Sequence, residues 1–312
     1  MRKIVCLVAV LLALAWGSPA RADTIQFNPF GTGAATAFTI DQMDPLPGNT
    51  ITLGIVPVVG DTGQVLFQAN LGTVSNGSNT LFGACIAGSP CFTFTAVVDV
   101  VVTSDVGDTL SLGLDPNATN NLFVMYTNDI NGNNLTGQCF ASFNATCTGT
   151  PILVGTFDTF SSSFTFSRDA NGNPLFGNLD QFGAQNYPGQ LTLFGGGDLS
   201  ALITVTASDP NYFPDLVDGT SIFVTSSQEH LPYQQVDPSQ CFSSNAVANC
   251  DQPGVAAIGG VNGTTPNTML QTDANISFLQ PHAVPEPASL MLLGSGLMGL
   301  AAARRRRSSK LN

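Results

Sequence analysis

Basic residues are scarce in this chain and almost absent from its middle. Lysine and arginine together number nine in 312 residues, and only Arg168 lies between Asp23 and Ala303. Residues 23–283 carry nineteen aspartates and Glu229 against that one arginine, a formal charge of −19. A surface of this sign repels nucleic acid and anionic lipid headgroups and attracts cations. The composition therefore excludes nucleic acid as a partner and leaves divalent cations and cationic molecules as candidates.

Histidine is nearly missing too, which limits the chemistry that the chain can perform. The two histidines, His230 and His282, lie in stretches rich in glutamine and proline. A nucleophilic serine or cysteine needs a neighbouring base, and the sequence contains neither a G-x-S-x-G elbow nor a P-loop. We expect no enzymatic activity and no catalytic residues. A hydrolase built on two aspartates is an alternative, but the sequence singles out no pair.

Helix-forming patterns are almost absent from residues 23–287, where β-rich segments recur between turn residues. In the strongest segment, residues 92–103, apolar residues at the even positions alternate with Thr93, Thr95 and Asp99 on a second, partly solvated face. Further strands are predicted at Ile51–Val59, Gln64–Asn70, Thr109–Leu114, Leu122–Thr127, Ile152–Phe157, Ser163–Ser167, Leu202–Thr206, Ser221–Thr225 and Asn275–Leu279.

Many short strands separated by turns predict an all-β fold, an antiparallel β-sandwich or jelly-roll-like body. Asn131-Gly132 and Asn171-Gly172 are dipeptides typical of tight turns. A β-helix is the alternative architecture, although the sequence shows no repeat of fixed period. Residues 228–281 are less regular and read as a long excursion that returns to the body.

The N-terminus carries a segment typical of exported proteins. Arg2 and Lys3 precede an apolar run from Ile4 to Trp16, and residues 20–22 have the small-x-small pattern of signal-peptidase cleavage. We therefore predict a signal peptide at residues 1–22.

The C-terminus has three parts in a fixed order. The four residues Val284, Pro285, Glu286 and Pro287 come first, an uncharged apolar run follows, and Arg304, Arg305, Arg306 and Arg307 close the series. As a helix, the run at residues 288–303 extends about 24 Å, a little less than a ~30 Å hydrocarbon core, and arginine stems can close the difference. Because positive flanks stay cytoplasmic, we predict a transmembrane helix at 288–303 and a cytoplasmic tail at 304–312.

This three-part end resembles the PEP-CTERM sorting signal of Gram-negative bacteria. The resemblance covers residues 284–307 and carries no information about the remainder of the chain. In that family an exosortase, an integral-membrane transpeptidase-like enzyme, recognises the signal, cuts near the motif and passes the protein on. The resemblance implies an exosortase as partner, a precursor anchored in the inner membrane, and a final place at the cell envelope surface or outside the cell.

Six cysteines lie outside the predicted signal peptide, and their even number in an exported chain predicts disulfides. They fall into three closely spaced pairs: Cys85 and Cys91, Cys139 and Cys147, and Cys241 and Cys250. We favour these three local bridges, although the sequence leaves other pairings open. A metal site is the alternative, disfavoured because no pair has C-x-x-C spacing.

Two loops begin like calcium-binding loops, with oxygen-bearing side chains at alternate positions. The residues are Asp129, Asn131 and Asn133 in the first loop, and Asp169, Asn171, Asn173 and Asp180 in the second. Asn134 and Pro174 occupy the sixth positions, where glycine is needed for the sharp turn. Because Asp-x-Asn-Gly is also a common turn sequence, we favour ordinary turns, and a weak calcium site in one of the two loops is the alternative.

These observations predict an exported structural protein of the cell surface or extracellular matrix. Its expected parts are the signal peptide, a disulfide-bonded all-β extracellular domain at 23–281, a stalk with the sorting motif at 282–287, and the membrane helix and tail. The resemblance also implies an association with exopolysaccharide in biofilm or floc. A calcium-assisted carbohydrate-binding or adhesive module is the alternative, although few tyrosines and a single tryptophan disfavour strong sugar stacking.

Overall fold

A computed structural model describes residues 24–86, 88–128, 130–132, 140, 149–172, 175–178, 191–193, 195–229 and 268–279. All of them belong to the first of two compact units, which ends at Leu279. The predicted signal peptide, stalk, membrane helix and basic tail lie outside these residues. No described segment forms an apolar helix of membrane-spanning length.

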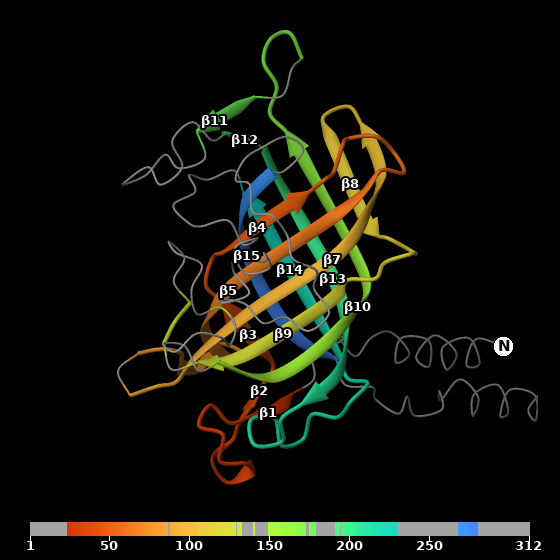
Figure 1. The fold of residues 1–312 in the computed structure, drawn as a ribbon. Coiled ribbons are helices and arrows are strands. Elements are labelled where there is room, and N and C mark those ends of the chain that lie inside the picture. The colour runs from red at the N-terminus through yellow and green to blue at the C-terminus, as the bar shows by residue number, and fades with distance from the viewer. Residues whose placement is uncertain are drawn as a thin grey trace, which may run out of the picture. The chain divides into compact units, whose positions relative to one another are not determined.

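The described residues form β-strands and a single short 3-10 turn, and all strand pairs are antiparallel (Figure 1). In chain order the elements are β1 Ile25–Phe27, the turn Ala34–Thr36, β2 Phe38–Ile40, β3 Gln42–Pro45, β4 Gly48–Leu53, β5 Thr62–Asn76, β6 Asn79–Gly83, β7 Cys91–Val106, β8 Thr109–Leu114, β9 Asn121–Asn128, β10 Thr150–Phe166, β11 Phe176–Asn178, β12 Leu191–Leu193, β13 Gly195–Ser208, β14 Ser221–Glu229 and β15 Thr268–Leu279. The predicted antiparallel all-β class is confirmed.

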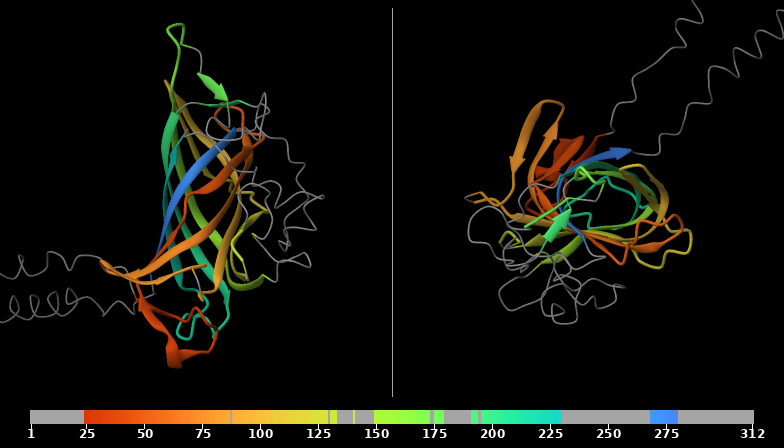
Figure 2. Two further views of the ribbon diagram at one scale, coloured as in Figure 1. Left: turned by 90° about the vertical axis from the view of Figure 1, so that its left-hand side faces the viewer. Right: turned by 90° about the horizontal axis from the view of Figure 1, so that it is seen from above.

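Eleven of these strands form one sheet that closes on itself. The pairings run from β5 through β4, β15, β14, β13, β10, β9 and β7 and back to β5. Seen from above, the strands follow a ring (Figure 2, right). The prediction of a sandwich was therefore wrong, because a single closed sheet stands in place of two packed sheets, and the short pairs β1–β2 and β11–β12 are separate from it.

Long, irregular strands explain the closure. β5, β7 and β10 have 15, 16 and 17 residues. β10 pairs with β13 along its length, and on its other edge with β9 near its start and β8 near its end. Register shifts between Val154 and Gly155 and between Phe157 and Thr159 bend β10. Alternation of apolar and polar residues predicts the faces of a strand but not this curvature.

The interior of the closed sheet is apolar. The six even-numbered residues of 92–102 all belong to the main hydrophobic core, as their alternation predicts. Thr93 and Thr95 on the opposite face are also fully buried, so the prediction of a partly solvated face was wrong there. It holds farther along β7, where Asp99 is half-buried and Thr103 is exposed.

The far side of β7 is buried because later parts of the chain lie against it. The Thr93 hydroxyl donates to the carbonyl oxygen of Phe140 (2.7 Å), and the Asn70 side chain bonds the backbone of Gly132. Gln68 on β5 and Tyr126 on β9 are fully buried on the same face. Part of β5, β7 and β9 is therefore covered on both faces.

Asp99 fixes the connection between β8 and β9. Its Oδ2 accepts hydrogen bonds from the backbone N–H groups of Thr119 (2.8 Å) and Asn120 (2.9 Å), and its Oδ1 accepts one from Gln64 (2.8 Å). Burial by itself raises the pKa of Asp99, but these hydrogen bonds to the charged form outweigh it and lower the pKa below its usual value. The ionised carboxylate thus holds the connection at neutral pH.

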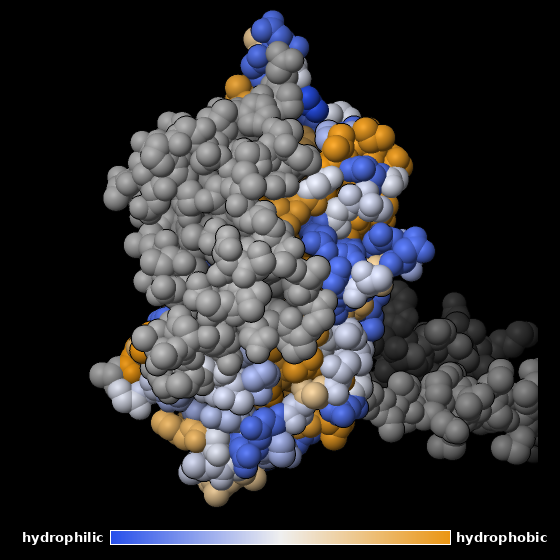
Figure 3. Space-filling view, viewed as in Figure 1, coloured by the Kyte–Doolittle hydropathy of each residue, from blue (hydrophilic) through white to orange (hydrophobic). Residues whose placement is uncertain are grey.

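The loop between β4 and β5 exposes apolar residues at one end of the sheet. Val56, Val58 and Val59 are exposed, and the loop lies at the upper right of Figures 1 and 3, where hydrophobic residues gather. The Val56 N–H donates to Asp61 Oδ2 (2.6 Å), and Gly60 N–H donates to the Val102 carbonyl (2.9 Å). The loop is therefore held by hydrogen bonds with its valines in solvent.

Candidate functional site

A polar groove of about 490 Å³ lies on the outer face of β10, β13, β14 and β15. In Figure 2 (left), β13, β14 and β15 lie side by side along this part of the sheet. The lining residues are Ser161, Ser163, Asp198, Leu199, Ser200, Thr225, Ser226, Asp273 and Asn275. Most of these side chains carry hydroxyl, carboxylate or amide groups. Such groups can form hydrogen bonds with hydroxyl-rich ligands, and the carboxylates can bind cations.

Strand register brings these residues together from distant parts of the chain. One row across the sheet runs from Ser161 through Ser200 and Thr225 to Asn275. Alternate residues of the same strands face the core, where Ala201 and Ile276 are buried. The period of two along each strand thus gives one polar outer face and one apolar inner face.

Two carboxylates flank the central strand of the groove. Asp198 on β13 and Asp273 on β15 both pair in register with Ser227 of β14. Two strand spacings separate them, about 10 Å between backbones. A polyhydroxylated chain, or a chain with several ammonium groups, can reach both carboxylates when it lies across β14.

No described cation neutralises these acids. Arg168, the single basic residue of the described ranges, forms a salt bridge with Asp108 and donates to the carbonyls of Gly107 (2.8 Å) and Gly172 (2.9 Å). On β3, next to β15, the pKa of Asp44 is raised, first by burial and then by the negative charge of Asp273, while a hydrogen bond with Thr73 opposes the shift. The edge of the groove is therefore electronegative.

An aromatic ring and an amide pair border the groove. Phe223 lies two residues before Thr225 on the same face of β14 and is 37% exposed. Its register partners are Leu202 and Ser277. On β3, Gln42 Nε2 donates to Asn275 Oδ1 (2.6 Å). Phe223 can supply one apolar platform for a sugar ring beside the polar lining.

A much smaller cavity lies inside the closed sheet. It has a volume of about 50 Å³ and is lined mainly by apolar side chains. Its polar groups are Thr50 and Thr272, whose hydroxyls bond each other (2.5 Å), and Ser226, whose Oγ has no hydrogen-bond partner. This volume is in the range of one or two water molecules. The outer groove is therefore the candidate ligand site.

The predicted calcium loops are only partly described. Asp129, Asn133, Asn173 and Asp180 lie outside the described residues. Asp169 and Asn171 form an ordinary turn, in which Asp169 Oδ1 accepts the Asn171 N–H (2.8 Å) and Gly172 adopts a positive φ of 84°. The Oδ1 of Asn131 is buried without a hydrogen-bond partner. The described residues contain no cluster of three or more His, Cys, Asp or Glu side chains suited to a metal ion. Calcium binding stays the alternative to ordinary turns.

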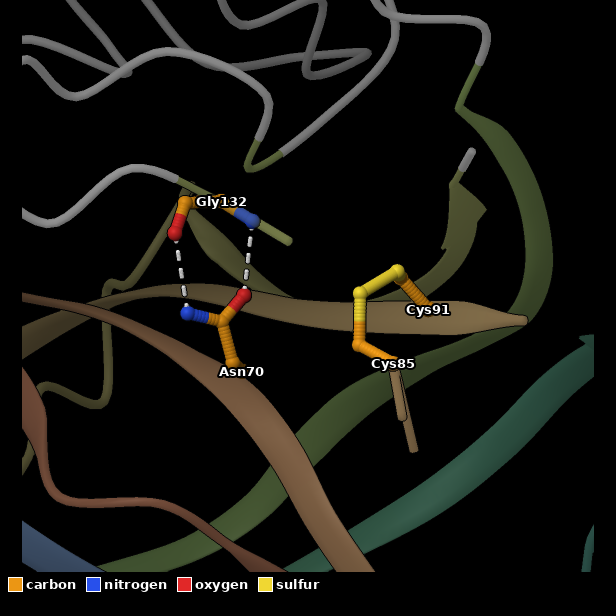
Figure 4. Close-up of a disulfide and its surroundings, with 4 residues drawn as sticks. All are labelled: Asn70, Cys85, Cys91 and Gly132. Carbon is orange, nitrogen blue, oxygen red and sulfur yellow. Dashed lines mark hydrogen bonds between the residues drawn. A yellow bond between two sulfur atoms is a disulfide. The ribbon is translucent and has the colours of Figure 1, made fainter. Parts of the chain in front are cut away.

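One predicted disulfide lies within the described residues and is confirmed. Cys85 and Cys91 are bonded, which closes the short loop before β7 (Figure 4). Figure 4 places the bridge near the Asn70–Gly132 contact. The other four cysteines, Cys139, Cys147, Cys241 and Cys250, lie outside the described residues, so their pairing stays a prediction.

Sequence reasoning did not identify the groove. Asp198 follows the glycines at 195–197, but the sequence shows no partner for it. Asp273, Asn275 and Thr225 carried no signal, because nothing in a single strand shows which distant strand lies beside it. The alternation at residues 163–167 was the one local hint that Ser163 faces outward.

Comparison with known proteins identifies the C-terminus alone. No curated protein and no solved structure matches this chain. A family model described as the PEP-CTERM protein-sorting motif matches residues 283–307. The predicted sorting residues, Val284–Pro287 and Arg304–Arg307, all lie within this match, and they lie outside the described residues. The motif is the recognition signal for an exosortase, and the chain is therefore an exported, exosortase-sorted protein with a body of no identified family.

Proposed function

We propose that this protein is a non-enzymatic component of the cell surface or extracellular matrix, held there by contact with exopolysaccharide. The sorting motif at 283–307 supports the proposed location, because a protein with this signal is exported. The outer groove supports the proposed contact with exopolysaccharide.

The groove has the properties that a polysaccharide chain requires. It is open along the sheet, and the hydroxyls of Ser161, Ser200 and Thr225 form a continuous row with Asn275. Sugar hydroxyls both donate and accept, so each of these side chains can find a partner on a sugar. The proposal includes no catalytic residue.

Fractionation of cells that make or lack exopolysaccharide tests this function. We expect the protein in the matrix fraction of producing cells and in the medium of non-producing cells. The variant Thr225→Arg blocks the groove and is expected to move the protein into the medium of producing cells. Thr206→Arg is the control, because it adds the same side chain at an exposed position of β13 that does not line the groove. The protein with this substitution is expected to stay in the matrix. The same distribution in both strains would contradict the proposal.

A further inference from the structure

The charge of the groove selects among polysaccharides. Asp198 and Asp273 contribute two carboxylates to the lining, and Asp44 stands beside Asp273. The one arginine of the described ranges is already paired with Asp108. A polyuronate or sulfated chain would bring further negative charge against this surface, whereas a neutral chain would leave the carboxylates without a charged partner.

We infer that the groove recognises an amine-bearing polysaccharide, a chain of glucosamine units with free ammonium groups, and not a neutral or acidic one. This inference deepens the proposed function and rests on it. The ammonium groups bind the carboxylates of Asp198 and Asp273 on either side of β14. The sugar hydroxyls form hydrogen bonds with the row of polar side chains that runs from Ser161 to Asn275.

The chemistry of each group supports this pairing. An ammonium is a donor of three hydrogen bonds with no acceptor, and a carboxylate is an acceptor only, so the two satisfy each other without a bridging ion. The spacing of two strands between the carboxylates prevents both from binding one ammonium tightly. Adjacent amines along a polymer can instead occupy the two positions, and Phe223 at the border offers an apolar face to a ring between polar contacts.

Three oligosaccharides of equal length test the inference by calorimetry with the full-length chain, kept in mild detergent because of its apolar run. The probes are a glucosamine hexamer, its N-acetylated form, and a uronate hexamer, at a mildly acidic pH that keeps the glucosamine amines protonated. We expect the glucosamine hexamer to bind about tenfold more tightly than the N-acetylated form, and the uronate hexamer not to bind. Added salt should weaken the first interaction most.

Isosteric variants assign the effect to the groove. The double variant Asp198→Asn with Asp273→Asn should lower affinity for the glucosamine hexamer about tenfold and leave the N-acetylated form within about twofold. Asp105→Asn with Asp218→Asn removes the same charge from exposed positions outside the groove and should change neither affinity.

The outcomes separate this inference from the proposed function. Equal binding of the charged and neutral hexamers overturns the inference and supports the function. Absence of all binding in a protein that is still retained by matrix also overturns the inference alone. Absence of binding together with no retention overturns both. Loss of affinity in the control pair as large as in the groove pair would show a general charge effect and overturn the assignment to this groove.

Discussion

Replacing Phe27 by alanine is expected to lower the free energy of unfolding by about 3–5 kcal/mol. Phe27 is fully buried in β1, and its ring centroid lies 5.4 Å from that of Phe92 and 5.3 Å from that of Phe213. The contact joins β1 to β7 and to the loop before β14, and backbone bonds cannot replace it. A cavity at this point would also weaken the contact between Phe82 and Phe92, 6.2 Å apart.

Phe30 provides the matched control for Phe27. It is 53% exposed and its ring contacts Phe82 at 6.5 Å, so Phe30→Ala should cost less than about 1 kcal/mol. Urea unfolding of the oxidised, full-length chain, followed by circular dichroism, measures both variants. Equal destabilisation by the two substitutions would show that the aromatic cluster around Phe27 does not hold this end of the sheet.

Asn70→Ala is expected to destabilise the protein by about 2–5 kcal/mol, because it leaves two buried backbone groups without partners. The Asn70 amide donates to the Gly132 carbonyl (2.9 Å), and its oxygen accepts the Gly132 N–H (2.7 Å) (Figure 4). The pair mimics a strand pairing and attaches the segment after β9 to the outer face of β5. Space is tight there, since a Cβ on Gly132 would lie 2.6 Å from the Phe140 ring.

Two further substitutions sharpen the Asn70 measurement. Asn76 makes one exposed hydrogen bond, from its amide to the Thr39 carbonyl (3.0 Å), and Asn76→Ala should cost less than about 1 kcal/mol. Asn70→Asp puts a carboxylate against the Gly132 carbonyl at neutral pH, and acidification should restore part of its stability as the acid becomes a donor. An Asn70→Ala variant as stable as Asn76→Ala would contradict the bracing role.

Much of the fold follows from local sequence patterns. The apolar alternation at 92–102 predicted both the strand and its inner face, and the range Thr109–Leu114 was predicted with the bounds that β8 has. The predicted strand at 51–59 begins at Gly48 and ends at Leu53, because residues 55–61 fold into a hydrogen-bonded loop. A valine-rich sequence favours a strand, but hydrogen bonds to other parts of the chain hold residues 55–61 as a loop.

The arrangement of strands, and with it the groove, depends on contacts that no local pattern contains. Residues 152–157 and 163–167 were predicted as two strands, but both predictions fall on the single strand β10, which ends at Phe166 and continues through its register shifts. Asp198 and Asp273 lie 75 positions apart in the sequence. They line the same groove only because their strands pair with opposite edges of β14. The burial of Thr93 could not be predicted either, because it depends on contact with Phe140, which lies 47 residues away in the sequence.

The central claim is that an exosortase sorts this acidic body to the exterior. Intact mass measurement of the exported protein tests it, because the mass shows where the chain ends. In cells with an exosortase, the exported protein should have lost Arg304–Arg307 by a cut near the motif at 284–287. In otherwise identical cells without the enzyme, those arginines should remain attached. An exported protein that ends at Asn312 in both cells would contradict the account.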